Sequence, residues 1–218
     1  ADIGGMPMVV HTWRAAQQHP DIQRACVATD SEDIAEAVTK AGGEALLTAA
    51  SHTTGTDRCQ EAWSHWGDDG AVINLQGDEP FPDPAHLSAI CATLRMNQWD
   101  IVSAMRPASQ EDVASPHRVK VAVNAHQQAL YFSRSPVPSG GPFQVHIGIY
   151  GFGPGALTRC AALPQGTLEK SERLEQLRWL ESGMSIGMVS VSEGTSPGPV
   201  DTAEDLSRLR LWYQQQTP

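Results

Sequence analysis

The alternation of short strand-like runs with helix-periodic segments is the feature that most constrains the fold of this chain. Residues 24–29 and 71–75 have the pattern of buried strands. Apolar residues recur at helical spacing after each of them, over 31–41, 59–66 and 84–96. Such alternation predicts a parallel sheet with helices on both faces. The expected class is therefore α/β.

Denser strand patterns follow the first hundred residues and indicate a small β-rich insert. They lie at 101–105, 119–123, 129–133 and 145–152. The insert would complete a mixed, mainly parallel sheet. A late helix carrying Leu174, Leu177 and Leu180, a strand over 186–191 and a C-terminal helix close the pattern. No repeat or linker interrupts it, so residues 1–218 are expected to form a single domain.

Composition excludes several classes of function. Hydrophobic residues make up 40% of the chain and charged residues 18%, as in a globular protein. The net charge of −10, with only three lysines, argues against nucleic-acid binding, which needs a basic face. No apolar run approaches the roughly 18–20 residues of a membrane span. The four scattered cysteines form no C-x-x-C pair and predict neither a zinc site nor a disulfide framework, so a reducing, cytoplasmic setting is expected.

Two acidic segments are candidates for a metal site. Gln76-Gly77-Asp78-Glu79-Pro80 follows a predicted strand, where α/β sheets bind ligands. A carboxylate there suits Mg²⁺, and an ordinary acidic turn is an equally good interpretation. Asp201 is best explained locally as a helix N-cap, with Glu204 three residues later. Capping and metal binding are compatible, because a carboxylate has two oxygens.

Three polar segments are candidates for small-molecule contacts. Residues 52–58 open a helix and could offer N–H groups to an anion or a base edge, although N-capping by Thr56 explains them equally well. Arg134 follows an aromatic strand end and suits a carboxylate clamp, or is simply solvated. His146, Gly148 and Tyr150 share one side of a strand, where they form either a ligand wall or ordinary structure.

Taken in series, several blocks of this sequence resemble the 3-deoxy-manno-octulosonate cytidylyltransferases, also called CMP-Kdo synthetases. The blocks occur in the family's order along nearly the whole chain. They lie at residues 2–8, 27–30, 41–43, 55–58, 76–80, 131–134, 146–151, 174–178 and 200–206. The resemblance implies a nucleotide-diphospho-sugar transferase-like fold. It also implies transfer of the cytidylyl group of CTP to the anomeric hydroxyl of Kdo, for lipopolysaccharide or capsule synthesis.

The resemblance also implies roles for particular residues. Asp78 and Asp201 would be catalytic Mg²⁺ ligands, and Gly55, Arg58 and Asp78 would lie at the nucleotide. The sugar-acid pocket would hold the following residues: Gln76, Arg134, His146, Tyr150, Glu175 and Gln176. The partners would be CTP and Kdo, with no nucleic acid or membrane. The family tends to form homodimers, for which Trp179, Trp212 or Tyr213 would be interface residues unless they pack in the core.

The chain departs from the family pattern in three places. Gly5 stands where the family often has Lys, the loop between Arg134 and His146 is short, and the family's N-terminal strand and phosphate loop are missing. Because a triphosphate needs more cationic or N–H donors than this chain offers, we expect the protein to continue upstream of Ala1 with a buried strand and a flexible Arg/Gly/Pro loop. The alternatives are a cytidylyltransferase for another 2-keto sugar acid (an 8-amino Kdo analogue or a sialic acid-like sugar) and a non-catalytic sugar-nucleotide binding protein.

Overall fold

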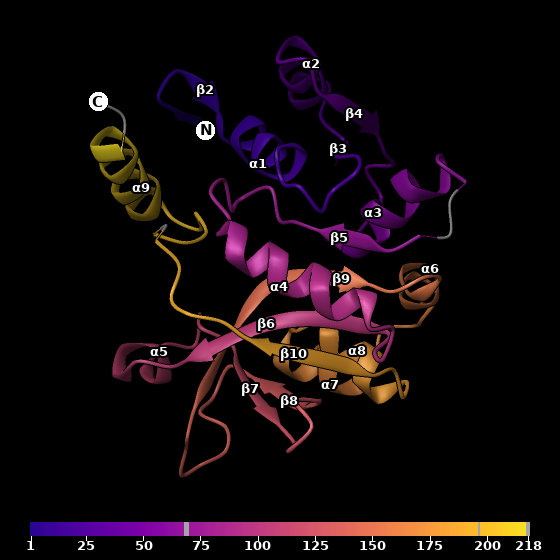
Figure 1. The fold of residues 1–218 in the computed structure, drawn as a ribbon, viewed down its shortest axis with the longest axis vertical. Coiled ribbons are helices and arrows are strands. Elements are labelled where there is room, and N and C mark those ends of the chain that lie inside the picture. Colours follow the sequence, from indigo (N-terminus) through magenta and orange to yellow (C-terminus); the bar gives the residue numbers. More distant parts are fainter. Residues whose placement is uncertain (68–69, 196, 217–218) are drawn as a thin grey trace. The chain divides into compact units, whose positions relative to one another are not determined.

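The computed structural model describes residues 1–67, 70–195 and 197–216. The chain divides into two compact units (Figure 1). The first comprises Ala1–Gly67, Leu75–Ser88 and Gly194–Pro218, and the second comprises Asp68–Asn74 and Ala89–Glu193. Helix α4 (Pro84–Arg95) belongs to both, since it begins in the first unit and continues into the second.

The first unit is built on two short pairs of strands and the helices around them. Strands β1 (Asp2–Ile3) and β2 (Met6–Pro7) are antiparallel, whereas β3 (Cys26–Thr29) and β4 (Glu44–Leu47) are parallel. The helices are α1 (Met8–Gln17), α2 (Glu32–Lys40), α3 (Gly55–Ser64) and α9 (Ala203–Gln216). Helix α2 connects β3 to β4, the helical crossover that a parallel pair requires, although the sequence pattern does not predict the strand β4.

The start and end of helix α2 follow from its sequence. The side chain of Ser31 accepts a hydrogen bond from the backbone N–H of Ile34 and caps the first turn. Gly42 has a φ of +85°, a left-handed conformation that ends the helix at little steric cost. Val38, at the centre of the apolar stripe, is fully buried.

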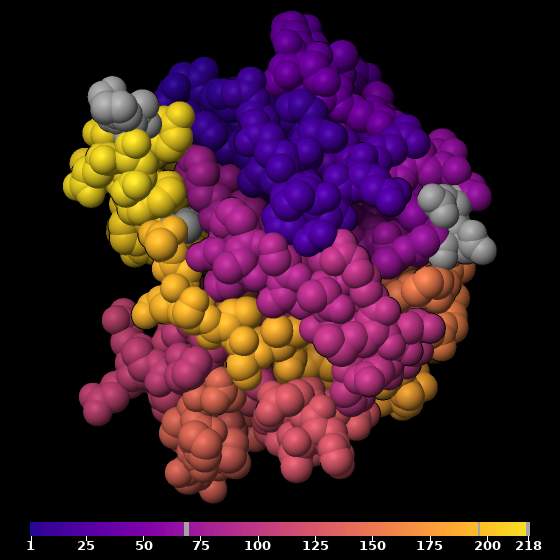
Figure 2. Space-filling view, in the orientation of Figure 1, coloured from indigo at the N-terminus to yellow at the C-terminus, as the bar shows by residue number. Residues whose placement is uncertain are grey.

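The two terminal segments of the first unit lie side by side (Figure 2). Arg210 Nε donates to the carbonyl of Asp2 at 2.8 Å. Gly4 has a φ of +61°, and a Cβ atom there would lie 2.2 Å from the ring of Tyr213. Both the backbone conformation and the close contact therefore require glycine at this position. Trp212 and Tyr213 pack against the ring of Phe81 within the same unit.

The second unit contains a six-stranded mixed sheet. Its main path runs β10-β6-β9-β7-β8, and β5 pairs with β9. β10 and β6 are parallel, and the other pairs are antiparallel. The strands are β5 (Val72–Asn74), β6 (Ile101–Pro107), β7 (Lys120–Val123), β8 (Ala129–Ser133), β9 (Gln144–Phe152) and β10 (Ile186–Ser190). The predicted α/β class with a mixed sheet is confirmed, although the sheet of this unit is not mainly parallel, because antiparallel pairs outnumber its parallel pair.

Helices cover opposite faces of β9. A Cβ atom at Gly151 would lie 2.5–2.8 Å from side chains of Ile90 and Leu94, so α4 packs directly on that face. The rings of Tyr150 and Phe152 contact Trp179 of α8 (Gln176–Glu181) from the other face. Trp179 is fully buried and belongs to the core of this unit.

One shift of register lies between β6 and β9. Ala104 pairs with Ile147, but the preceding residue of β6, Ser103, pairs with Tyr150. Gly148 and Ile149 therefore bulge out of the ladder. His146 and Tyr150 stay on the same face of the sheet as Ser103, because the bulge adds an even number of residues.

The expectation of one late helix is wrong, because the segment forms two. Helix α7 (Thr167–Glu172) ends at Arg173, whose φ is +56°, and α8 begins three residues later. Glu169 and Arg178 form a buried ion pair across this break. Nine residues of continuous helix would separate them by about 14 Å along the axis, so the pair requires the break. The remaining short helices are α5 (Gln110–Ala114) and α6 (Ala156–Ala161).

Candidate functional site

Asp78 and Asp201 are brought together in the first unit. Asp78 lies in a turn in which Glu79 N donates to Gln76 O at 3.1 Å. The carbonyl of Asp78 accepts a hydrogen bond from Val200 N at 2.9 Å, which fixes the residue before Asp201 beside the turn. Burial raises the pKa of Asp78, and the negative charge of Asp201 raises it further. Two neighbouring carboxylates that repel each other are suited to share a cation.

The prediction that Asp201 caps the C-terminal helix is wrong by one residue. Thr202 is the cap: its hydroxyl accepts from Asp205 N at 3.1 Å, and Thr202 N donates to the Asp205 carboxylate at 2.9 Å. This reciprocal pair is a capping box. The side chain of Asp201 is exposed and makes no hydrogen bond within the part of the chain that the structure describes. Its carboxylate is therefore available for a ligand.

Glu79 is a further acidic group in this turn. Burial raises its pKa to about 7, with an added contribution from the charge of Asp78. A cation bound between Asp78 and Asp201 would offset this effect, because it would favour the charged form of every nearby carboxyl. The donor set therefore fits Mg²⁺, which prefers carboxylate oxygens.

The predicted nucleotide residues lie on and before helix α3 of the first unit. The N-cap is Thr54, whose side chain accepts from Asp57 N at 3.1 Å, so capping by Thr56 is wrong. Gly55 is the first residue of the helix. The guanidinium of Arg58 donates to Thr48 Oγ1 at 2.6 Å and pairs with Asp30 at 3.2 Å. Arg58 thus joins the ends of β3 and β4, while its contact with cytidine stays a prediction.

Three of the predicted sugar residues, His146, Tyr150 and Glu175, lie near one another in the second unit. The rings of His146 and Tyr150 have centroids 5.3 Å apart. Burial lowers the pKa of His146 to about 3, so the imidazole is neutral near pH 7. Burial and the nearby charge of Glu175 raise the pKa of Tyr150, which keeps its hydroxyl protonated. Glu175 directly precedes α8 without a capping hydrogen bond from its side chain, and the buried Gln176 is the first residue of the helix.

Arg134 directly follows β8 in the same unit, and main-chain oxygens hold its guanidinium. Nε donates to Glu172 O at 3.0 Å, Nη1 to Pro116 O at 3.1 Å and Nη2 to Arg173 O at 3.3 Å. A guanidinium has five N–H groups, so one remains on each terminal nitrogen. Bidentate binding of a carboxylate uses two N–H groups of one guanidinium. The remaining sugar candidate, Gln76, lies in the first unit beside Asp78.

Sequence reasoning missed two residues that fix Arg134. The carboxylate of Glu172 accepts from Ser133 Oγ at 2.9 Å and Arg134 N at 3.0 Å. Lys120 is fully buried, and its ammonium donates to the carbonyls of Ser115, Arg118 and Arg134 at 2.6–2.8 Å. A lysine within the otherwise apolar run 119–123 was the available signal for the second of these.

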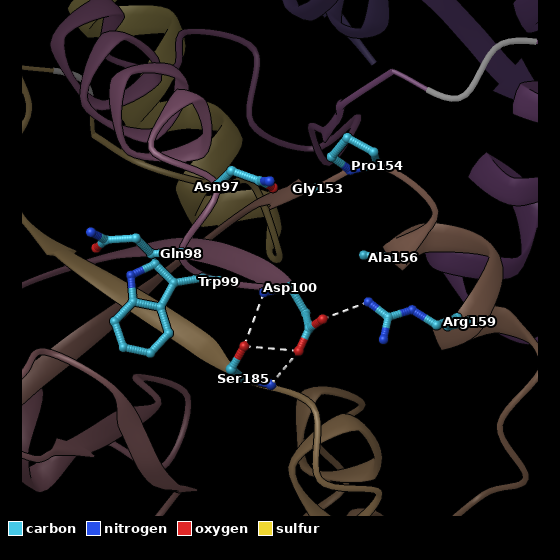
Figure 3. Close-up of a pocket in the computed structure, with 9 residues that line it drawn as sticks. All are labelled: Asn97, Gln98, Trp99, Asp100, Gly153, Pro154, Ala156, Arg159 and Ser185. Carbon is cyan, nitrogen blue, oxygen red and sulfur yellow. Dashed lines mark hydrogen bonds and ion pairs between the residues drawn. The ribbon is translucent and has the colours of Figure 1, made fainter.

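A separate polar hollow in the second unit is lined by side chains that bond to one another (Figure 3). The Asp100 carboxylate accepts from Ser185 N and Oγ, both at 2.8 Å, and pairs with Arg159 at 2.5 Å. These bonds connect the start of β6 to that of β10. The hollow therefore has a structural explanation.

Comparison with known proteins shows the family to which the chain belongs and the group of enzymes within that family that it matches. The cytidylyltransferase family profile matches residues 1–186. The chain therefore belongs to the cytidylyltransferase family and is a nucleotidyltransferase. Within that family it belongs with the 3-deoxy-manno-octulosonate cytidylyltransferases, as the sequence blocks indicate. The enzyme of Nitrobacter winogradskyi is 43% identical over 218 residues, covering 96% of this chain and 85% of the relative. That of Chlorobium phaeovibrioides is 41% identical over 227 residues, covering 96% and 88%.

Solved structures agree with this assignment. A CMP:2-keto-3-deoxy-manno-octonic acid synthetase complexed with CTP matches with a TM-score of 0.93 and 34% identity, covering 99% of this chain and 91% of that chain. A glucose-1-phosphate thymidylyltransferase from Bacillus anthracis, described as putative, matches at 14% identity with a TM-score of 0.67 and shares the fold alone. Within the described residues, no helix has the length and apolar character needed to cross a membrane.

Proposed function

We propose that this chain catalyses the reaction of its family, transfer of the cytidylyl group of CTP to Kdo, with Asp78 and Asp201 as the metal-binding pair. The observation that carries the assignment of the pair is the backbone bond from Val200 N to Asp78 O. It holds two carboxylates together, and neither side chain is needed to cap a helix. The product would serve lipopolysaccharide or capsule synthesis in the cytoplasm.

Different residues of the chain would have different roles in this reaction. Asp78 and Asp201 would hold Mg²⁺, which supplies charge neutralisation of the triphosphate and lowers the proton affinity of a bound hydroxyl. Arg134 would bind the sugar carboxylate through its two remaining terminal N–H groups. His146 and Glu175 would bind sugar hydroxyls, and the anomeric hydroxyl would attack the α-phosphorus of CTP. That oxygen would lose its proton to water and form the new bond to the α-phosphorus as the bond between this phosphorus and the pyrophosphate oxygen breaks, with no covalent enzyme intermediate.

The test is Asp78→Asn in the full-length protein. Turnover at saturating CTP and Kdo is expected to fall at least about a hundredfold, the effect of losing one preorganised electrostatic group. Thermal stability should be retained, since this carboxylate repels Asp201 and loses its charge in the variant. Asp33→Asn, on the exposed surface of α2 in the same unit, is the matched control and should retain full activity. Near-normal turnover by Asp78→Asn at saturating Mg²⁺ would remove Asp78 from the site.

A further inference from the structure

Ser103 is a fully buried polar residue in the apolar part of β6. Its neighbours Ile101, Val102, Ala104 and Met105 are also buried. Ser103 pairs with Tyr150 across the β6–β9 ladder, at the point where the register shifts. Its hydroxyl therefore lies on the face that carries His146 and Tyr150.

The hydrogen bonds of Ser103 fix where the proton of His146 must be. Ser103 Oγ lies 2.8 Å from Ile149 O, 3.1 Å from Ile147 O and 2.9 Å from His146 Nε2. Carbonyl oxygens only accept, so the single hydroxyl hydrogen of Ser103 is directed at them. Ser103 Oγ can then only accept from the imidazole. The neutral ring must carry its hydrogen on Nε2 and a lone pair on Nδ1.

Nδ1 of His146 makes no hydrogen bond to any described residue. The ring itself is held between aromatic neighbours, with centroids 5.1 Å from Phe132 and 5.3 Å from Tyr150. Because burial keeps the imidazole neutral, Nδ1 is a fixed acceptor at pH 7.

We propose that Ser103 is a positioning residue for sugar recognition: it holds His146 as the Nε2–H tautomer, so that Nδ1 accepts a hydrogen bond from a sugar hydroxyl. This inference rests on the proposed function. A site built on such an acceptor selects sugars that present a donor there, because a sugar without one leaves a polar atom unpaired.

A purely structural role for Ser103 makes a different prediction. Its hydroxyl also satisfies carbonyls exposed by the bulge, so loss of that hydroxyl alone would lower stability and affect both substrates equally. A positioning role affects the sugar selectively. The two roles are therefore separable by measurement.

The first measurement is made on the full-length wild-type protein without substrate. Imidazole ¹⁵N NMR distinguishes a protonated from an unprotonated ring nitrogen, and the spectrum of His146→Gln assigns the His146 signals. The proposal expects a protonated Nε2 and an unprotonated Nδ1. A proton on Nδ1 would overturn it.

The second measurement is kinetic and compares Ser103→Ala with Ser103→Thr. Ser103→Ala should raise the KM for Kdo about three- to tenfold, the range of one hydrogen bond, and leave the KM for CTP within about twofold. Ser103→Thr keeps the hydroxyl and should restore most of the Kdo affinity. Ser185→Ala is the matched control, since its hydroxyl bonds to Asp100 next to the start of β6, in the same unit.

An unchanged KM for Kdo in a folded Ser103→Ala protein, or equal rises for both substrates, would overturn the positioning role. Wild-type protein that turns over no Kdo would instead overturn the proposed function. That result is distinguishable because it appears before any substitution is made.

Discussion

Arg178→Met should severely destabilise the second unit. Arg178 and Glu169 form a bidentate pair, with Nε–Oε2 at 2.7 Å and Nη2–Oε1 at 2.6 Å. Their exposed fractions are only 6% and 5%. Burial raises the pKa of Glu169, but the hydrogen bonds and charge of Arg178 outweigh this and hold the pKa below its ordinary value. Removing the arginine leaves a buried carboxylate without its partner, which costs about 3–5 kcal/mol.

Urea unfolding at pH 7 measures this loss directly. Arg178→Met should lower the free energy of unfolding by about 3–5 kcal/mol, whereas Glu169→Leu combined with Arg178→Met should recover most of it, since an apolar pair has no charge to desolvate. The controls are the exposed partners Glu36 and Lys40, whose separation should cost less than about 1 kcal/mol. A loss below about 1 kcal/mol for Arg178→Met would refute the reasoning, because it would mean that water or another group compensates the charge.

Three further predictions concern the carboxylates. Thr202→Ala should lower the free energy of unfolding by about 1 kcal/mol through loss of the α9 cap, while Asp201→Asn should lower turnover and leave stability unchanged. Denaturation and steady-state assays of both variants check this prediction. A loss of stability in Asp201→Asn with none in Thr202→Ala would show that Asp201 is the cap. Glu79 has a pKa raised from 4.5 to about 7, so the folded state keeps a proton that the unfolded chain loses between these values. Stability therefore falls as pH rises through this window, and Glu79→Gln should remove up to about 3 kcal/mol of that fall in EDTA; parallel pH curves for the two proteins would contradict it. Glu175→Ala should raise the KM for Kdo far more than the KM for CTP, and a matched rise would indicate general damage to the fold.

Local signals in the sequence predicted most of the elements. The helix over 32–40 has a capping serine, an apolar stripe and a terminal glycine, and all three act as expected. The predicted N-cap of the C-terminal helix differs by one residue from the observed one, because Asp201 and Thr202 are both residue types that cap helices well. Asp205, three residues after Thr202, decides between them through a capping box. The leucine spacing of the late segment predicts one continuous helix, because it gives no sign of the left-handed conformation of Arg173.

The sequence predicts the segments that carry the candidate site, but it does not predict which of their residues lie close together in space. Asp78 and Asp201 stand in recognisable segments, but their proximity depends on a backbone bond between residues 122 positions apart. The link from Ser103 to His146 spans 43 positions and exists only in one register of β6 and β9. Local periodicity carries no information about such pairings. The burial that makes His146 neutral is likewise set by neighbours distant in the chain, including Phe132.

The bulge in β9 has a consequence for how this sequence can change over generations. His146 and Tyr150 share a face because three residues lie between them, two of which are outside the ladder. Deleting either Gly148 or Ile149 would turn one of the two rings to the opposite face, because side chains alternate along a strand. Substitution at these two positions leaves that parity intact. We therefore expect evolution to conserve the number of residues in this segment more strictly than their identity, and to tolerate insertions or deletions here only when two residues change together.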